Sequence, residues 1–256
     1  MKSRIANIVF GLLLLAIAVI DWQYGISSIF YWIVILIFSL VNFWGTINIS
    51  FQYFISAKCS ADKNDGSVAI TFDDGPAQDK TSQVLEILKQ YEVSATFFCI
   101  GKNVNEHPEI AKQINERGHI IGNHSYFHGT WFDMQLPKAI VKELDDTNTA
   151  IQQAIGKTPR LFRPPYGVTN PLLASAVKQT GHAVIGWSVR SFDTVTSDRK
   201  KLFNRVTRKL KSGDVILFHD RCESTIEILP EVLAHVKERG LKVVPLDQLL
   251  NEKAYV

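Results

Sequence analysis

The N-terminal part of the chain is almost without charge, and this feature restricts the fold more than any other. Between residues 5 and 57 the only charged side chain is that of Asp21. It lies in a short turn between two apolar stretches, and a bilayer core requires about 20 apolar residues in a helix. The pattern predicts a membrane region over residues 1–57, with a hairpin of two transmembrane helices at about 5–24 and 26–45.

Two other interpretations of this region stay open. Lys2 and Arg4 precede the apolar run, and Ala16-Ile17-Ala18 resembles a cleavage site, so the segment could be a cleaved signal peptide. Two helices buried in a soluble core would also be apolar. We prefer the hairpin, because the second stretch alone is long enough to cross a bilayer.

The remaining composition excludes two classes of protein. The net charge is only +3 over the 256 residues, so no nucleic-acid partner is predicted. The three cysteines, Cys59, Cys99 and Cys222, are odd in number and far apart. They predict free thiols rather than a disulfide framework or a cysteine-rich zinc site.

A polar linker at residues 58–66 precedes a domain at residues 67–256 in which apolar strand-like runs alternate with amphipathic helices. This alternation is typical of a parallel α/β sheet, and seven strands favour a barrel over an open sheet. The seven predicted strands are 68–72, 95–100, 119–122, 161–163, 183–187, 214–218 and 242–244.

Chemistry in such barrels lies at the carboxyl ends of the strands. Reactive side chains occur at or shortly after these ends throughout the domain. They are Asp73, Asp74, His124, His128, Arg163, Asp193 and His219.

The paired acids Asp73 and Asp74 suggest a division of labour. Neighbouring side chains on an extended strand point to opposite sides, so one acid can bind a metal while the other accepts a proton. An Asx turn formed with Gly75-Pro76 is the structural alternative, but such a turn does not require the second acid.

The histidines at positions 124 and 128 are four residues apart and can face one point. Together with one carboxylate they would form a three-ligand metal site that keeps a position open for water. The spacing alone is a weak signal, because a pair of surface or core histidines has the same spacing.

Four motifs in order resemble those of the polysaccharide deacetylases with a NodB homology domain, carbohydrate esterase family 4. The resemblance covers roughly residues 66–250. It implies a distorted (β/α)7 barrel, one divalent metal ion, most often Zn²⁺, and removal of acetyl groups from an N-acetylated carbohydrate. The motifs are Thr71-Phe72-Asp73-Asp74-Gly75-Pro76, His124-Ser125-Tyr126-Phe127-His128, Arg163-Pro164-Pro165-Tyr166-Gly167 and Leu217-Phe218-His219.

The resemblance also implies a role for each motif residue. Asp74, His124 and His128 would bind the metal. Asp73 would be the general base that deprotonates the attacking water, and His219 the general acid that protonates the leaving amine.

Other motif residues would support these groups. Arg163 would hold Asp73 in its ionised state, and Asp193 would orient His219. The backbone N–H of Tyr166 would help to stabilise the oxyanion. The residues expected to contact the sugar are Pro165, Tyr166, Trp131 and Leu217.

One segment departs from the family pattern. Arg190 stands where the family commonly has an acid, and Thr194 stands where it commonly has Trp. The missing Trp should change one wall of the sugar pocket, for which Phe192 or Trp131 could compensate. The reaction is therefore better defined than the substrate, which could be a polysaccharide such as peptidoglycan or chitin, or a lipid-linked N-acetylhexosamine.

Two further functions stay open: an O-acetyl carbohydrate esterase, and a catalytically silent carbohydrate-binding membrane protein. The membrane side is also open. Lys2 and Arg4 before the hairpin, with Lys58 and Lys63 after it, place both ends in the cytoplasm by the positive-inside rule. Catalytic domains of the family that this chain resembles usually lie outside the cytoplasm. We expect an integral protein of a bacterial-type inner membrane, in contact with membrane lipid.

Overall fold

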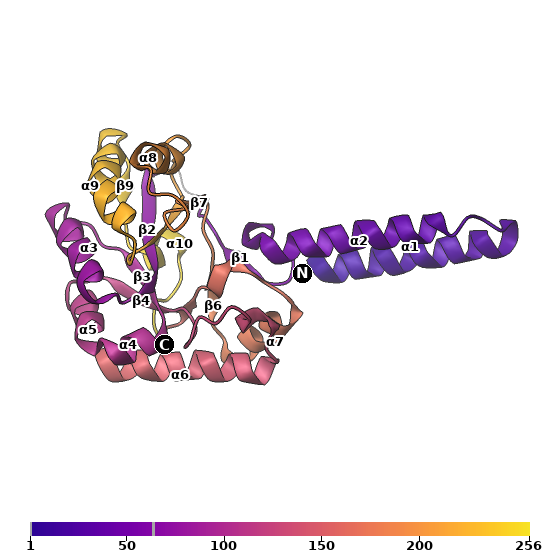
Figure 1. Cartoon of the computed structure of the whole chain (residues 1–256), viewed down its shortest axis with the longest axis horizontal. Coiled ribbons are helices and arrows are strands. Elements are labelled where there is room, and N and C mark those ends of the chain that lie inside the picture. Colours follow the sequence, from indigo (N-terminus) through magenta and orange to yellow (C-terminus); the bar gives the residue numbers. More distant parts are fainter. Residues whose placement is uncertain (1, 63–64) are drawn as a thin grey trace.

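The computed structural model describes residues 2–62 and 65–256. Figure 1 shows a long helical hairpin that projects from an α/β domain, with the turn of the hairpin farthest from that domain. The hairpin consists of α1 (Lys2–Tyr24) and α2 (Ile29–Ile47). Both predicted helices are therefore formed, with ends shifted by at most three residues. The rings of Phe10 and Phe38 stack between them with centroids 4.0 Å apart.

The apolar side chains of the hairpin are exposed along most of its length. Both helices are long and apolar enough to cross a membrane, and almost none of their apolar windows is buried against the rest of the protein. Twenty-three helical residues span about 34 Å, which matches a hydrocarbon core of about 30 Å. The buried pair of core helices that the sequence left open is not formed.

The base of the hairpin is attached to the domain by backbone contacts. The amide of Ser3 donates to the carbonyl of Tyr53 at 3.1 Å, and the amide of Thr169 donates to the carbonyl of Thr46 at 2.9 Å. Gly45 permits this approach, because a Cβ there would lie 2.4 Å from the Tyr53 ring. The segment that follows α2 thus belongs to the core of the domain.

This attachment changes the predicted boundary between the parts. Ala57–Lys58 forms strand β1, which pairs in parallel with β6, and Ser60 bridges to Asp214. The predicted linker at 58–66 therefore begins inside the sheet. Two-residue strands have no periodic pattern, which is why the sequence did not reveal it. Lys63, counted in the orientation argument, lies outside the described residues.

The domain is built on a parallel sheet in the order β1-β6-β5-β4-β3-β2-β8-β7, and β9 pairs with the beginning of β2. All seven predicted strands are formed; β1 and β7 are additional. This confirms the α/β fold of parallel strands. The strands are β1 (Ala57–Lys58), β2 (Ser67–Gly75), β3 (Thr96–Cys99), β4 (Ile120–Asn123), β5 (Leu161–Phe162), β6 (Ala183–Ile185), β7 (Val189–Arg190), β8 (Val215–His219) and β9 (Lys242–Val243).

Helices connect most of these strands, and their ends follow local sequence signals. The Asn170 side chain accepts from the Leu173 amide at the start of α7, and Gly181 ends that helix in the left-handed region. The helices are α3 (Gln78–Gln90), α4 (Gly101–Glu106), α5 (Pro108–Glu116), α6 (Pro137–Ile155), α7 (Pro171–Thr180), α8 (Arg199–Thr207), α9 (Glu223–Glu238) and α10 (Leu246–Leu250), with 3-10 turns at η1 (Ile49–Phe51), η2 (Phe132–Met134) and η3 (Pro165–Gly167).

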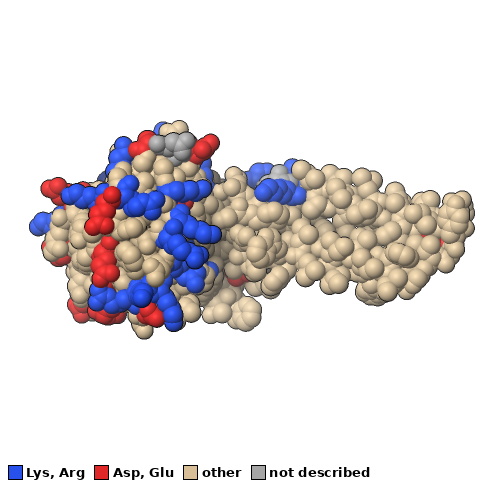
Figure 2. All heavy atoms as spheres, turned by 90° about the horizontal axis from the view of Figure 1, so that it is seen from above, with Lys and Arg blue, Asp and Glu red and all other residues tan. Residues whose placement is uncertain are grey.

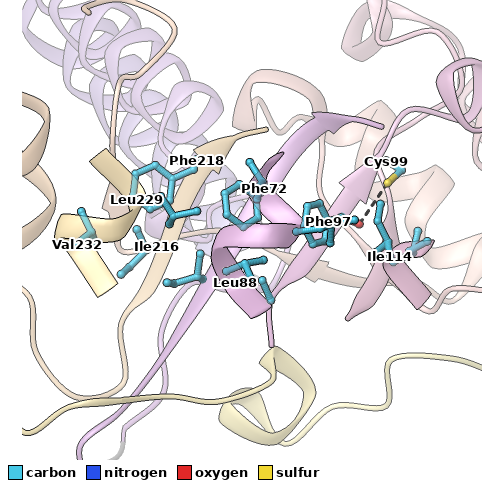
Figure 3. Close-up of a cluster of buried hydrophobic side chains, with 14 of the residues drawn as sticks. Phe72, Leu88, Phe97, Cys99, Ile114, Ile216, Phe218, Leu229 and Val232 are labelled. Carbon is cyan, nitrogen blue, oxygen red and sulfur yellow. Dashed lines mark hydrogen bonds between the residues drawn. The ribbon is translucent and has the colours of Figure 1, made fainter. Parts of the chain in front are cut away.

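Strand β2 is buried along its whole length and organises the largest apolar cluster. Figure 3 shows Phe72 between Phe97 and Phe218, with ring centroids 4.9 Å and 6.0 Å away. Alternate residues of a strand face opposite sides, so Thr71 and Asp73 point away from this cluster. The packing of Phe72 therefore fixes the strand that carries the site.

Candidate active site

The end of β2 brings both acids of the pair to one pocket. Asp73 lies opposite His219 of the neighbouring strand β8, and the register with β3 shifts between Asp73 and Gly75. Asp74 occupies this bulge with a φ of 73°. A bulge re-aims the side chain that it carries. Simple alternation predicted opposite sides for the two acids, but both lie close to the same imidazole.

Asp74, His124 and His128 meet as a candidate metal site. Asp74 Oδ1 lies 3.5 Å from His124 Nε2 and 3.4 Å from His128 Nε2, and three potential ligand atoms lie within 4.8 Å of one another. Ligands of a tetrahedral zinc ion, with bonds of about 2.0–2.1 Å, lie about 3.3 Å apart. The triad therefore has the spacing that a bound ion requires.

Two further observations fit a metal ion. Among the described residues, Asp74 Oδ1 is buried and has no hydrogen-bond partner, which is costly unless a cation is bound. His124 Nδ1 lies 2.7 Å from the carbonyl oxygen of Arg163. That carbonyl can only accept, so Nδ1 carries the proton and Nε2 presents a lone pair to the triad.

The protonation of these groups suits metal ligands. Burial lowers the pKa of His128 to about 4, so its imidazole is neutral near pH 7. Burial would raise the pKa of Asp74, but the electrostatic influence of His124 and His128 outweighs burial and holds that pKa well below its usual range. A neutral imidazole and a carboxylate are the forms that bind a divalent ion.

Arg163 supports Asp73 from the buried interior of the domain. Its side chain is fully buried and donates to Asp73 Oδ1 at 2.7 Å and to Thr71 Oγ1 at 2.7 Å. It also donates to the carbonyl of Gly186 at 2.9 Å, and its guanidinium lies over the Phe98 ring at 4.2 Å. Asp73 Oδ2 remains directed to the pocket, 3.8 Å from His124 Nε2.

His219 and Asp193 form the second pair. His219 Nδ1 lies 2.7 Å from Asp193 Oδ1, and the His219 amide donates to Asp193 Oδ2 at 2.7 Å. Thr225 also donates to this carboxylate. Burial lowers the pKa of His219, but the hydrogen bond and charge of Asp193 outweigh burial and raise it above its usual value. The pair therefore favours an imidazole that holds its proton near neutral pH.

Backbone strain is concentrated around this constellation. Of the eight described non-glycine residues with positive φ, five surround the site. Such conformations cost about 1–3 kcal/mol each and persist where the surrounding structure enforces them. The five are Asp74, Ser125, His128, Tyr166 and Phe192.

Sequence reasoning missed one residue and left another undecided. Arg221 Nε donates to Asp74 Oδ2 at 2.9 Å, although its side chain is half exposed; no motif pointed to it. Asp220 is fully buried beneath the acid pair, accepts from Thr81 Oγ1 at 2.6 Å, and has a pKa raised to about 7 by burial. Its place in the sequence, directly after His219, is compatible with either a supporting role at the site or a helix cap.

The side chains at this site that line a cavity of about 430 Å³ are Asp73, Asp74, His124, His128, His219 and Arg221. Of the residues expected to contact the sugar, Tyr166 and Leu217 line it. Pro165 is buried and Trp131 is 73% exposed, and neither lines the cavity. The two residues that depart from the family pattern, Arg190 and Thr194, also line the cavity.

Comparison with known proteins supports the same assignment. Residues 60–185 match the family model described as polysaccharide deacetylase. A peptidoglycan-N-acetylglucosamine deacetylase of Bacillus cereus is 34% identical over 195 residues, which is 74% of this chain and 91% of that protein. Peptidoglycan-N-acetylmuramic acid deacetylase PdaC of Bacillus subtilis is 33% identical over 76% of this chain, which spans only 41% of PdaC. These names are those of N-deacetylases, which confirms the predicted enzyme class.

Solved structures resemble the domain closely. A peptidoglycan N-acetylglucosamine deacetylase in complex with a naphthalenyl N-oxidanyl-benzamide has a TM-score of 0.69 at 29% identity, covering 77% of this chain and 93% of that one. A family 4 pseudoenzyme from Bacillus anthracis has a TM-score of 0.71 at 31% identity, covering 77% and 69%. On these grounds, this chain belongs to the polysaccharide deacetylase family, carbohydrate esterase family 4.

Proposed function

We propose that this protein is a metal-dependent hydrolase that removes the acetyl group from an N-acetylated sugar. One observation carries the proposal: the triad of Asp74, His124 and His128 lies in the same cavity as two separately supported groups, Asp73 and His219. A ligand set, a base and an acid are the parts that amide hydrolysis by an activated water requires.

The metal site would be held by the triad. A bound divalent ion, most often zinc in this family, polarises the acetyl carbonyl and lowers the pKa of water. Asp74 would contribute Oδ1, since Arg221 occupies Oδ2. The carbonyl of Arg163 would keep His124 in the tautomer that ligates through Nε2.

Asp73 is the proposed base. Its Oδ1 accepts from Arg163, which leaves Oδ2 facing the cavity to take a proton from the attacking water. The fixed guanidinium of Arg163 keeps the Asp73 carboxylate oriented and leaves Oδ2 accessible to water. Asp73 and Asp74 thus divide their roles through their partners, one bonded to Arg163 and the other to Arg221.

His219 is the proposed acid. Asp193 orients the ring through Nδ1 and raises its pKa, so Nε2 can carry a proton to the leaving nitrogen. An amide nitrogen leaves poorly unless it is protonated, and a histidine with a pKa near neutral is suited to the task. The backbone N–H of Tyr166, in the strained turn beside the cavity, is the proposed oxyanion donor.

The hairpin would anchor this domain in a membrane. Its exposed apolar faces support this proposal, and the contacts of Ser3 and Thr169 at its base argue against removal as a signal peptide. In this proposal the membrane surface would lie near Thr169, which contacts the base of the hairpin and follows the turn of Tyr166 and Gly167 in the sequence. A substrate at the membrane surface, such as a lipid-linked N-acetylhexosamine or peptidoglycan near the bilayer, would therefore lie close to the cavity.

The side of the membrane can be tested directly. The flanking cations favour the cytoplasm, and on that side a lipid-linked sugar would be the accessible substrate. We expect a reporter that works only in the cytoplasm to be active when it is fused after Val256. Activity of a periplasm-specific reporter at the same position would instead favour a cell-wall polymer.

A silent carbohydrate-binding protein is the second candidate, because one similar structure is described as a pseudoenzyme. The proposed base, acid and metal ligands are all present in this chain, which favours catalysis. Acetate release from matched N-acetylated and O-acetylated oligosaccharides, with added zinc, separates the functions. Release from the N-acetylated sugar supports the proposal. Release from the O-acetylated sugar alone indicates an esterase, and binding without release indicates the silent protein.

A further inference from the structure

A second cavity of about 830 Å³ lies beside the catalytic cavity, between β7 and α8. Figure 2 looks onto this side of the domain, where Lys and Arg side chains gather between a row of acidic residues and the hairpin. Five cationic residues line the cavity, and no acidic residue does so among those described. The five are Arg190, Lys201, Arg205, Arg208 and Lys209, which we call the basic groove.

Aromatic stacking fixes two of these cations. The guanidinium groups of Arg190 and Arg205 lie 4.7 Å and 4.6 Å from the ring centroid of Phe192, and Arg190 also lies 5.4 Å from the Trp187 ring. Such stacking restricts the guanidinium and leaves its edge free to bind a ligand. Phe192 itself is held in a left-handed conformation, so this arrangement is built into the loop.

The charges of the basic groove are poorly compensated. Among the described residues, Lys201 alone of the five has a carboxylate partner within ion-pair distance, Asp198 at 3.2 Å. The Nε atom of Arg190 is buried and has no hydrogen-bond partner in the described part of the chain. A buried donor without a partner is costly, and several unpaired cations around one hollow attract a multiply charged anion.

Arg190 connects this groove with the reaction site. It lines both the basic groove and the cavity that contains Asp74 and His219. A ligand that places its acetamido group at the metal triad could therefore extend past Arg190 to Arg205. The anion that the groove attracts would then be part of the substrate.

We propose that the basic groove binds a phosphate or diphosphate group carried by the sugar that is deacetylated. Arginine forks bind phosphate oxygens in pairs, and a diphosphate supplies enough charge for several of the five cations. The identification of the ligand as the sugar that is deacetylated rests on the proposed function. The binding of an anion in the basic groove does not. Lipid headgroups beside the hairpin are another source of phosphate, although a headgroup would not require the connection through Arg190.

The first test is a titration of the zinc-loaded full chain, in phosphatidylcholine nanodiscs, with inorganic pyrophosphate. We expect Arg205→Gln to weaken binding by about tenfold or more, as loss of one charge-assisted contact does. The matched control is Lys112→Gln, an exposed lysine on α5, which should bind like the wild type. The wild type and both variants retain the same metal triad, so a difference in pyrophosphate affinity reflects the basic groove. Equal affinity in wild type and Arg205→Gln would overturn the proposal.

The second test measures acetate release from a neutral N-acetylhexosamine oligosaccharide and from the same sugar bearing a diphosphate. We expect a lower KM for the diphosphate, and we expect Arg205→Gln to raise that KM about tenfold more than it raises the KM for the neutral sugar. Equal effects on both would overturn the substrate assignment, as would loss of the preference in nanodiscs that contain phosphatidylglycerol. No release from either sugar, with pyrophosphate binding intact, would refute the deacetylase and leave the anion site standing.

Discussion

His219 Nδ1 lies 2.7 Å from Asp193 Oδ1, and the amide of the same histidine donates to the other oxygen of that carboxylate. The pair raises the pKa of His219, and a general acid must be protonated to act. Activity should therefore persist as pH rises and fall only as it passes through this raised pKa.

Replacing Asp193 by Asn should move that fall to lower pH. The substitution removes the negative charge that raises the His219 pKa, so less of the protonated acid is present at a given pH. The measurement is kcat against pH, with Asp198→Asn, at the exposed start of α8, as the matched control. An unchanged alkaline limb in Asp193→Asn would show that His219 is not the acid.

Replacing Asp74 by Asn should remove the bound metal. Loss of an outer partner of a metal ligand costs about 10- to 100-fold in affinity, and loss of the charged ligand itself should cost more. Zinc content per chain after dialysis, measured by mass spectrometry, checks this, with Asp79→Asn on α3 as the control. Full zinc occupancy in Asp74→Asn would contradict the assigned site.

Replacing Arg163 by Met should destabilise the fold as well as stop the reaction. Removing one partner of a buried pair leaves the other charge uncompensated, which costs about 3–5 kcal/mol of the free energy of unfolding. Denaturant titration measures this, and the exposed Arg160→Met supplies the comparison. A loss of activity with unchanged stability would mean that Asp73 has other support.

Replacing Gly75 by Ala should disturb the packing between the acid pair and the buried Asp220. A Cβ at this position would lie 2.2 Å from Asp220 Oδ2, whereas a Cβ at Gly129 would meet nothing within 4 Å. Overpacking of this kind typically costs about 1–3 kcal/mol. We therefore expect Gly75→Ala to lower both the unfolding free energy and kcat, and Gly129→Ala to change neither. Equal behaviour of the two variants would contradict the close packing beneath the site.

The sequence was most informative where its signals are periodic or local. The alternation of apolar runs predicted the seven strands, and the positions of Asp73, His124 and His219 after such runs predicted the rim on which they meet. These features depend on strand period and on chain order, and both are properties of a single sequence.

Other features depend on tertiary contacts. The bulge that turns Asp74 toward the same pocket as Asp73 forms where β2 pairs with β3 on one side and with β8 on the other. Arg221 reaches Asp74 only because β8 lies beside β2. Strand β1 and the contact of Gly45 with Tyr53 likewise require the folded domain, so the sequence pattern suggested a linker where the sheet begins.

The metal dependence of acetate release by the intact 256-residue chain is the decisive measurement for the proposed deacetylase. The protein in nanodiscs is given an N-acetylated oligosaccharide and an N-acetylated lipid-linked sugar, first loaded with zinc, then after chelator treatment, and finally with zinc restored. We expect release by the loaded protein, loss with the chelator, and recovery with zinc. Undiminished release after chelation has removed the zinc, or no release from any N-acetylated sugar by a zinc-loaded protein, would contradict it.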